Sequence, residues 1–294
     1  MNPTGPAGPA APPKGIFRMR RGGLRTSQTG MRILLTNDDG IEAEGLECLE
    51  RIARTLSDDV WVCAPAVEQS GKGRGITLTE PLRVNRLGDR RFAVTGTPTD
   101  CVVLAVNDLM VDARPDLLLS GVNRGHNVGE DCSYSGTVAG ALQGMAFGIR
   151  SIALSQSLER FHDEVRAHWE TAEAFAPGII ERLLEQPWQS GVVMNLNFPA
   201  LPPTLVKEVE VTRQGFRDIG EMHAVKRTDL RGRDYYWMSF RGTKQEHADG
   251  TDLRAMDEGR ISVTPLHIDL THMPSVNDLK GQLGGSPPKA RTAA

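Results

Sequence analysis

The sequence lacks any hydrophobic run near the roughly 18 residues that a membrane-spanning helix needs, and its start carries no hydrophobic signal segment. Its four cysteines are scattered, with no Cys-x-x-Cys pair and no histidine at zinc-ligand spacing, so no zinc site is indicated. We therefore expect reduced thiols in a cytoplasmic protein that has no membrane partner.

No compositional bias points away from a globular fold. Hydrophobic residues make up 39% and charged residues 24% of the 294 positions, which excludes a collagen-like or fully disordered chain. Acidic residues are absent from the first 30 positions, which hold five Lys or Arg, whereas the rest has 29 basic against 37 acidic side chains. An acidic body argues against a nucleic-acid duplex as partner, because such binding depends on cationic neutralisation of phosphates.

The two ends of the chain read as extensions of one folded domain. Residues 1–30 contain five Pro and six Gly without periodicity, so we expect a disordered leader. From Asp278 the chain again becomes rich in Gly and Pro, which is typical of a flexible tail over 278–294. A single domain over 31–277 is therefore predicted.

Short apolar runs alternate with amphipathic segments through the first two thirds of the chain. The predicted strands are Ile33–Thr36, Val60–Cys63, Phe92–Val94, Asp116–Ser120, Ile152–Leu154 and Val192–Asn197. The predicted helices are Ala43–Leu56, Thr97–Leu109 with Thr97 as N-cap, Thr137–Phe147 and Asp163–Gln186. Such alternation predicts an α/β fold with a Rossmann-like, doubly wound and mostly parallel sheet, whose ligands bind at the carboxyl ends of the strands.

The pattern changes after Pro199. Val206–Val211, Tyr235–Phe240 and Ile261–Thr264 are β-like, with many charges and little helical signal between them. A C-terminal β-rich arm or subdomain is expected there rather than another βαβ unit.

The first candidate site is Asn37-Asp38-Asp39-Gly40, directly after the first strand. Adjacent carboxylates repel each other, and a divalent cation lying between them and a substrate relieves that cost. Oxygen ligands of this kind favour Mg²⁺, Mn²⁺ or Ca²⁺ over zinc. The same four residues also make a good ordinary turn, so both interpretations stand. The DxDxT spacing of aspartyl-nucleophile phosphatases is absent.

The second candidate is the segment Ser120–Gly129, in which Gly recurs every four residues and alternates with Asn123 and Asn127. Amide oxygens suit a hard cation, and amide and backbone N–H groups suit an anion, although a generic glycine-rich loop has the same composition. Neither a Walker loop nor a GxGxxG motif is present. His126 has no identifiable Ser or Cys partner, so a role as general base is not favoured.

The third candidate is Ser133–Thr137, at the start of a predicted helix. Hydroxyls and free N–H groups at a helix N-terminus form an anion site, and the alternative is ordinary capping by Ser135. Gly136, Gly140, Gly144 and Gly148 recur every four residues, which predicts a helix face packed closely against the sheet.

Together these segments resemble the SurE family, the stationary-phase survival proteins, which are metal-dependent nucleotidases of the cytoplasm. The resemblance covers about 31–271 and is carried by Arg32–Gly40, Gln69–Gly71, Gly96–Cys101, Ser120–Asn127, Tyr134–Val138, Gly250–Asp252 and Ile261–Leu266. It implies a Rossmann-like fold and a homodimer or homotetramer held by exchanged C-terminal arms, here about 206–265.

By motif, the resemblance places the ligands of one divalent cation, Mg²⁺ or Mn²⁺, on Asp38, Asp39, Ser70 and Asn123. It places the phosphate contacts on Asn127, Ser135, Gly136 and Thr137. Asp38, Asp39 and Asn127 are then the expected catalytic residues, with Asp38 or Asp39 preferred over His126 as acceptor of the proton of the attacking water.

The expected activity is hydrolysis of nucleoside 5′-monophosphates, with 3′-nucleotides and short polyphosphate as further substrates. Two alternatives remain open from the residues alone: an enzyme that is primarily an exopolyphosphatase, and a regulatory protein that binds nucleotides without turnover.

Overall fold

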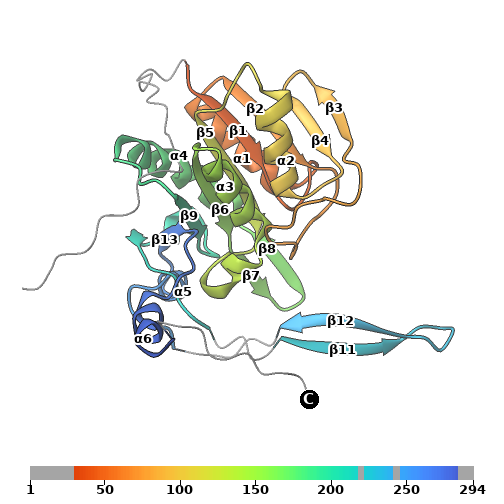
Figure 1. Cartoon of the computed structure of the whole chain (residues 1–294), viewed down its shortest axis with the longest axis vertical. Helices are drawn as coiled ribbons and strands as arrows, with labels where there is room; N and C mark the ends of the chain where they lie inside the picture. The colour runs from red at the N-terminus through yellow and green to blue at the C-terminus, as the bar shows by residue number, and fades with distance from the viewer. Residues whose placement is uncertain (1–29, 218–221, 241–245, 284–294) are drawn as a thin grey trace, which may run out of the picture.

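A nine-stranded sheet forms the centre of the molecule in the computed structural model, which describes residues 30–217, 222–240 and 246–283 (Figure 1). Its strand order is β10-β13-β9-β6-β5-β1-β2-β4-β3. The strands are β1 Arg32–Thr36, β2 Asp59–Pro65, β3 Val84–Gly88, β4 Arg91–Val94, β5 Leu117–Arg124, β6 Arg150–Gln156, β9 Val192–Phe198, β10 Val209–Val211 and β13 Ile261–His267.

Neighbouring strands run parallel except for β3 against β4 and β13 against β9. The chain passes from β1 to β2 on one side and later returns to place β5 on the other side of β1. The predicted doubly wound, mostly parallel sheet is thus confirmed, and its switch point lies between β1 and β5.

Helices cover both faces of the sheet because the central strands carry apolar side chains on both of their faces. One face packs against α1 (Glu44–Leu56) and α4 (Trp169–Glu185), the other against α2 (Pro98–Leu104) and α3 (Gly136–Ala146). In β1, Ile33 and Leu35 enter the first core and Leu34 the second, so each layer buries one side of the same strand.

Helix α2 begins as its sequence predicts. The Thr97 hydroxyl accepts the N–H of Asp100, the Asp100 carboxylate accepts the N–H of Thr97, and Pro98 stands at the first helical position. The helix ends at Leu104, however, and the expected continuation to Leu109 is a five-residue π-helical segment, Ala105–Leu109.

The helix predicted from Asp163 is wrong over its first turn and a half. Residues 158–167 form a hairpin, β7 (Leu158–Phe161) with β8 (Glu164–Ala167), and α4 begins only at Trp169. The buried His168 explains the difference, since its Nε2 contacts Glu159 at 2.8 Å and its Nδ1 contacts Glu170 at 3.0 Å. These two contacts fasten the hairpin to the start of the helix.

The strand predicted to end at Ser120 continues to Arg124. After a break in register, Asn123 pairs with Ser155 and Arg124 with Gln156 of β6. The first part of the glycine-rich segment therefore belongs to β5 and not to a loop, so pairing with β6 fixes the position of Asn123.

The C-terminal region is β-rich, as expected, but only part of it forms an arm. β13 and β10 join the main sheet, and the predicted strand Val206–Val211 shortens to Val209–Val211. β11 (Met222–Thr228) and β12 (Asp234–Phe240) form a separate hairpin that projects from the body (Figure 1).

The short helices are 3₁₀ segments Gly129–Ser133 and Pro203–Leu205, α5 Asp252–Asp257 and α6 Met273–Leu283. Residues 278–283, expected as part of a tail, complete α6, while the leader up to residue 29 and the rest of the tail lie outside the described residues. No helix in the described part of the chain has the length and hydrophobicity to cross a membrane.

The four cysteines are free, as expected.

Candidate functional site

The candidate residues gather at the carboxyl ends of three adjacent strands. Asp38 and Asp39 follow β1, Ser70 lies in the segment after β2, and Asn123 lies near the end of β5. Because β2, β1 and β5 are neighbours and parallel, these ends meet at one edge of the sheet. The N-terminus of α3 reaches the same edge.

Asp38 is the most enclosed carboxylate of the group, with 4% of its surface exposed. The Thr137 hydroxyl donates to its Oδ1, and the backbone N–H of Gly136 also donates to it. The pKa of Asp38 is raised to about 6. Burial raises it most, the hydrogen bonds lower it, and the neighbouring charge of Asp39 raises it. An ionised Asp38 is therefore poorly compensated by the protein alone.

Asp39 lies at the same turn but is partly open to solvent. Its Oδ2 accepts the backbone N–H of Arg124 at 3.0 Å, which fixes the carboxylate beside the end of β5. Burial raises the pKa of Asp39, the Arg124 N–H lowers it, and the negative charge of Glu68 raises it. This contact places Asp39 next to the residue that follows Asn123.

Ser70 approaches the two aspartates through the segment that carries it. The backbone N–H of Gln69 donates to the carbonyl oxygen of Asp38 at 2.7 Å. The Ser70 hydroxyl donates to Glu68 Oε1 at 2.9 Å. Glu68 was not predicted as a site residue, although its charge acts on Asp39 and its carboxylate holds Ser70.

The two asparagines of the glycine-rich segment have different surroundings. Asn123 donates its amide N–H to the carbonyl oxygen of Gly125 at 2.8 Å, which leaves the amide oxygen as the group that can coordinate a cation. Asn127 is buried, and its amide N–H donates to Ser155 Oγ at 2.9 Å. His126 contacts Ser157 Oγ at 2.9 Å.

The start of α3 contacts Asp38 directly. Ser135 is the N-cap and accepts the N–H of Val138, so the capping interpretation is confirmed. A Cβ on Gly136 would lie 2.7 Å from the Cβ of Asp38 and 2.8 Å from its Oδ2, so only glycine permits this approach.

The predicted close packing of the glycine face holds for three of its four members. A Cβ on Gly140 would meet Ser120 and Thr36, and one on Gly144 would meet Ser151 and Leu118. Gly148 follows the helix, has a φ of +75° and has no neighbour within 4 Å of an added Cβ, so there the prediction is wrong.

The donor set fits a hard divalent cation. Across the described residues no group of three or more His, Cys, Asp and Glu side chains is arranged to hold a metal, so a cation here would rely on two carboxylates and on neutral oxygens. Within the same residues neither Asp38 nor Asp39 forms a salt bridge. Asn37, next to them, has a buried Oδ1 without a hydrogen-bond partner. Unpaired carboxylates flanked by hydroxyl and amide oxygens suit Mg²⁺ or Mn²⁺.

Residues 33–221 match the family model described as Survival protein SurE. The chain belongs to the SurE family. It is 69% identical over 259 residues to a Caulobacter vibrioides protein, covering 88% of this chain and 98% of that one. It is 54% identical to a Hyphomonas neptunium protein, covering 85% and 98%. Both relatives are named 5′-nucleotidase SurE.

A solved SurE structure has the same fold. The crystal structure of the SurE protein from Aquifex aeolicus superposes with a TM-score of 0.72 at 36% identity, covering 85% of this chain and 99% of that chain. The α/β architecture derived from the alternating pattern is therefore also that of a SurE family member.

Two further asparagines of this SurE chain contact the site and were not predicted from the sequence. Asn195 and Asn197 lie on β9, and both donate amide N–H groups to the backbone carbonyl of Asn127, at 2.8 and 3.1 Å. Asn197 also accepts the Asn127 N–H at 2.8 Å. In the sequence, two polar residues alternate with apolar ones at the carboxyl end of an otherwise apolar strand, and this pattern could have indicated them.

Proposed function

We propose that this chain is a metal-dependent phosphomonoesterase that hydrolyses nucleoside 5′-monophosphates to nucleoside and phosphate. The relatives named 5′-nucleotidase SurE support the activity. The observation that carries the proposal is the pairing of Asp38 and Asp39 at the switch point with the N-terminus of α3 directly against Asp38. This combination offers a cation site and an anion site at one edge of the sheet.

Asp38, Asp39, Ser70 and Asn123 would hold one divalent cation, Mg²⁺ or Mn²⁺. A cation held there would supply Lewis-acid polarisation of a phosphoryl oxygen and a lower pKa for a coordinated water. Asp38 is oriented by Thr137 and Gly136, and Asp39 by the N–H of Arg124. The protein therefore fixes both carboxylates before any ligand arrives.

The phosphate group would be held by Asn127 and by Ser135, Gly136 and Thr137. Ser135 uses its oxygen as a helix cap, which leaves its hydroxyl proton available to a phosphate oxygen. The aligned peptide dipoles of α3 add positive potential at this end, which stabilises the negative charge that develops on the phosphoryl oxygens. Asn127 is held rigidly by Asn195 and Asn197.

A substrate panel tests the proposal. Phosphate release should be measured from 5′-nucleotides, 3′-nucleotides and polyphosphates of several lengths, with Mn²⁺ or Mg²⁺ and with EDTA. We expect metal-dependent release of phosphate from nucleoside 5′-monophosphates and slower release from 3′-nucleotides and short polyphosphate. Activity that rises with chain length and fails on monophosphates would instead make the protein an exopolyphosphatase. Nucleotide binding without release under any metal would support the regulatory binder.

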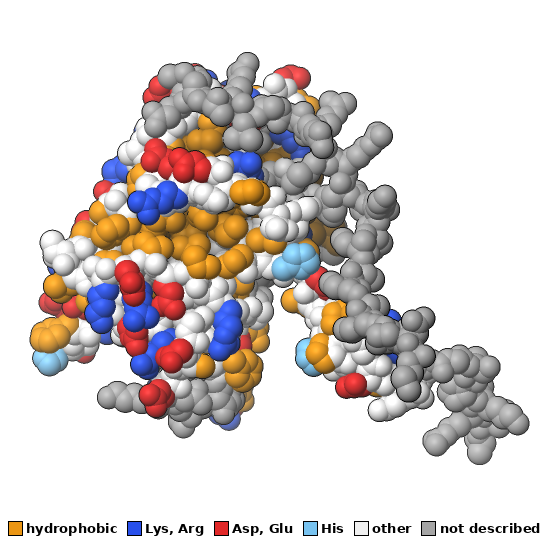
Figure 2. Space-filling view, turned by 90° about the vertical axis from the view of Figure 1, so that its left-hand side faces the viewer, with side chains coloured by type: hydrophobic (Ala, Val, Ile, Leu, Met, Phe, Trp, Pro, Cys, Tyr) orange, Lys and Arg blue, Asp and Glu red, His pale blue; other side chains and the backbone are white. Residues whose placement is uncertain are grey.

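Assembly into a homodimer or homotetramer through the C-terminal arm is part of the same proposal, as is a cytoplasmic location. The β11–β12 hairpin exposes a continuous run of large apolar side chains: Tyr235, Tyr236, Trp237 and Met238. The side of the body that carries α4 also shows a band of hydrophobic side chains bordered by charges of both signs (Figure 2). Apolar surface of this kind is typical of a protein contact, and a second copy of the chain is the expected partner.

The domain organisation stays a prediction: a disordered leader over 1–30, one nucleotidase domain over 31–277 that includes the arms at about 206–265, and a tail over 278–294. The first residues of that tail, 278–283, belong to α6.

A further inference from the structure

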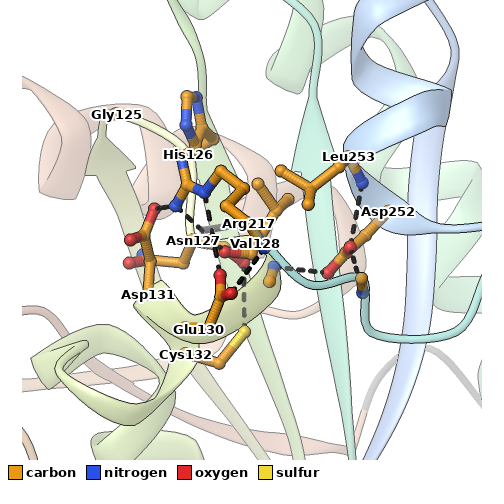
Figure 3. Close-up of polar contacts among 12 residues, drawn as sticks. Gly125, His126, Asn127, Val128, Glu130, Asp131, Cys132, Arg217, Asp252 and Leu253 are labelled. Carbon is orange, nitrogen blue, oxygen red and sulfur yellow. Dashed lines mark hydrogen bonds and ion pairs between the residues drawn. The ribbon is translucent and has the colours of Figure 1, made fainter. Parts of the chain in front are cut away.

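The loop from Asn127 to Ser133 is held by residues from the distant C-terminal part of the chain (Figure 3). Asp252, at the start of α5, has no exposed surface. Its Oδ2 accepts the N–H of Gly129 at 2.9 Å, and its Oδ1 accepts the N–H groups of Gly215 at 2.7 Å and Leu253 at 2.8 Å. One carboxylate thus joins the loop, the segment before β11 and helix α5.

Arg217 makes a second connection between the same two regions. Its guanidinium lies between Glu130 and Asp131, forms ion pairs with both and donates to the carbonyl oxygen of Val128 at 3.4 Å (Figure 3). Its backbone N–H donates to Glu130 Oε1. Gln214, nearby in the chain, donates to the carbonyl oxygen of Gly129 at 2.7 Å.

These contacts determine where Asn127 lies. The loop is fixed at successive residues: at Asn127 by the amides of β9, at Val128 and Glu130 by Arg217, and at Gly129 by Asp252. The same loop continues directly into Ser135, the cap of α3. A shift of the loop would therefore move both the Asn127 and the Ser135 side of the anion site.

We propose that Asp252 is a positioning residue for the phosphate-binding loop, with Arg217 as its second anchor. The inference rests on the proposed function of Asn127 and Ser135. It gives a role to Asp252 of the Gly250–Asp252 motif, which the predicted site leaves unused. It also links the loop to the base of the β11–β12 hairpin, because Gly215 and Arg217 belong to the segment that leads into it.

The chemistry of the contact requires a carboxylate. A buried carboxylate is costly unless its oxygens are hydrogen-bonded, and here backbone donors meet both of them. An asparagine has nearly the same shape but turns one acceptor into a donor. That donor would face the N–H of Gly129 or of Gly215, so one side of the connection must open.

The experiment compares Asp252→Asn with Thr251→Ala in the full-length protein. Thr251 caps the same helix by accepting the N–H of Arg254, and its side chain makes no hydrogen bond to the loop. Hydrogen exchange of the 126–135 amides, Mn²⁺ affinity, and kcat and KM for a nucleoside 5′-monophosphate are measured for each variant.

For Asp252→Asn we expect faster exchange in 126–135, unchanged Mn²⁺ affinity and kcat/KM lowered roughly 10- to 100-fold, as a misplaced binding group would cause. For Thr251→Ala we expect a lower Tm with loop exchange and kcat/KM like wild type. Equal loop exchange in Asp252→Asn and wild type would overturn the inference. So would a loss of kcat/KM in Thr251→Ala as large as in Asp252→Asn, because a general loss of stability would then explain both.

Failure of the proposed function gives a different result. A wild-type protein that releases no phosphate under any metal refutes the enzyme, and the exchange comparison still decides whether Asp252 holds the loop. Normal turnover in Asp252→Asn refutes the positioning role and leaves the enzyme intact. Arg217→Gln should act in the same direction as Asp252→Asn.

Discussion

Replacing Asp38 with asparagine should stabilise the metal-free protein while removing its activity. Burial raises the pKa of this carboxyl from its ordinary value of 3.8 to about 6. That rise corresponds to a free-energy cost of about 3 kcal/mol for keeping the ionised group in the fold. An asparagine removes the charge and keeps an oxygen that accepts the Thr137 hydroxyl, but its amide must also be desolvated. We therefore expect a gain of about 2 kcal/mol.

The gain in unfolding free energy should shrink as the pH falls. A carboxyl whose pKa is higher in the folded than in the unfolded state destabilises the fold fully above the folded value, here about 6. As the pH falls from about 6 toward 4, the folded state takes up a proton before the unfolded state does, and the cost disappears. The difference between Asp38→Asn and wild type should therefore be largest at pH 8 and close to zero near pH 4.

Calorimetric Tm values in EDTA at pH 8 and pH 4 measure this effect. For a domain of this size about 2 kcal/mol corresponds to a Tm increase of about 4–8 °C at pH 8. Asp58→Asn, which removes an exposed carboxylate before β2, should leave the Tm unchanged. Addition of Mn²⁺ should raise the Tm of wild type and not that of Asp38→Asn. A lower Tm for Asp38→Asn at pH 8, or a difference that does not vary with pH, would refute the reasoning.

Three further substitutions test the site, a glycine control in α4 and the arm. Gly136→Ala places a Cβ 2.7 Å from Asp38, so it should lower Mn²⁺ affinity in calorimetric titration and reduce turnover. Gly178→Ala, inside α4 with nothing within 4 Å of the new Cβ, should instead stabilise the protein by about 0.5–1 kcal/mol and leave turnover unchanged. Trp237→Ser removes an exposed aromatic from the hairpin and should shift the mass measured by light scattering toward the monomer, whereas an unchanged mass would place the interface elsewhere.

Much of this fold could be predicted from local sequence patterns. The apolar runs of β1 and β2 are buried on both faces, so they could be recognised without knowledge of their neighbours. Thr97, Pro98 and Asp100 specify the start of α2 through contacts within four residues. The closeness of the Asp38–Asp39 turn to the end of β5 could be predicted because both lie at carboxyl ends of neighbouring parallel strands, and such ends meet. The full ligand set, including Ser70 and Asn123, rests on the resemblance to the SurE family and stays a prediction.

The parts that escaped prediction depend on contacts between distant residues. The β7–β8 hairpin is fastened by Glu159 to His168, which local periodicity does not register. β13 enters the main sheet by pairing with β9, although its sequence is equally suited to a separate subdomain. Gly129 and Asp252 are 123 positions apart, so no local pattern relates them.

The central claim is that Asp38 and Asp39 hold a divalent cation that the hydrolysis requires. Phosphate release from a nucleoside 5′-monophosphate should be followed across a Mn²⁺ titration for wild type, Asp39→Asn and Asp58→Asn. We expect phosphate release by wild type and Asp58→Asn, and EDTA should abolish it. In Asp39→Asn the rate of release should fall by at least about 100-fold, because a charged ligand of the cation is gone. Release that persists in EDTA, or an Asp39→Asn variant as active as wild type, would contradict the claim.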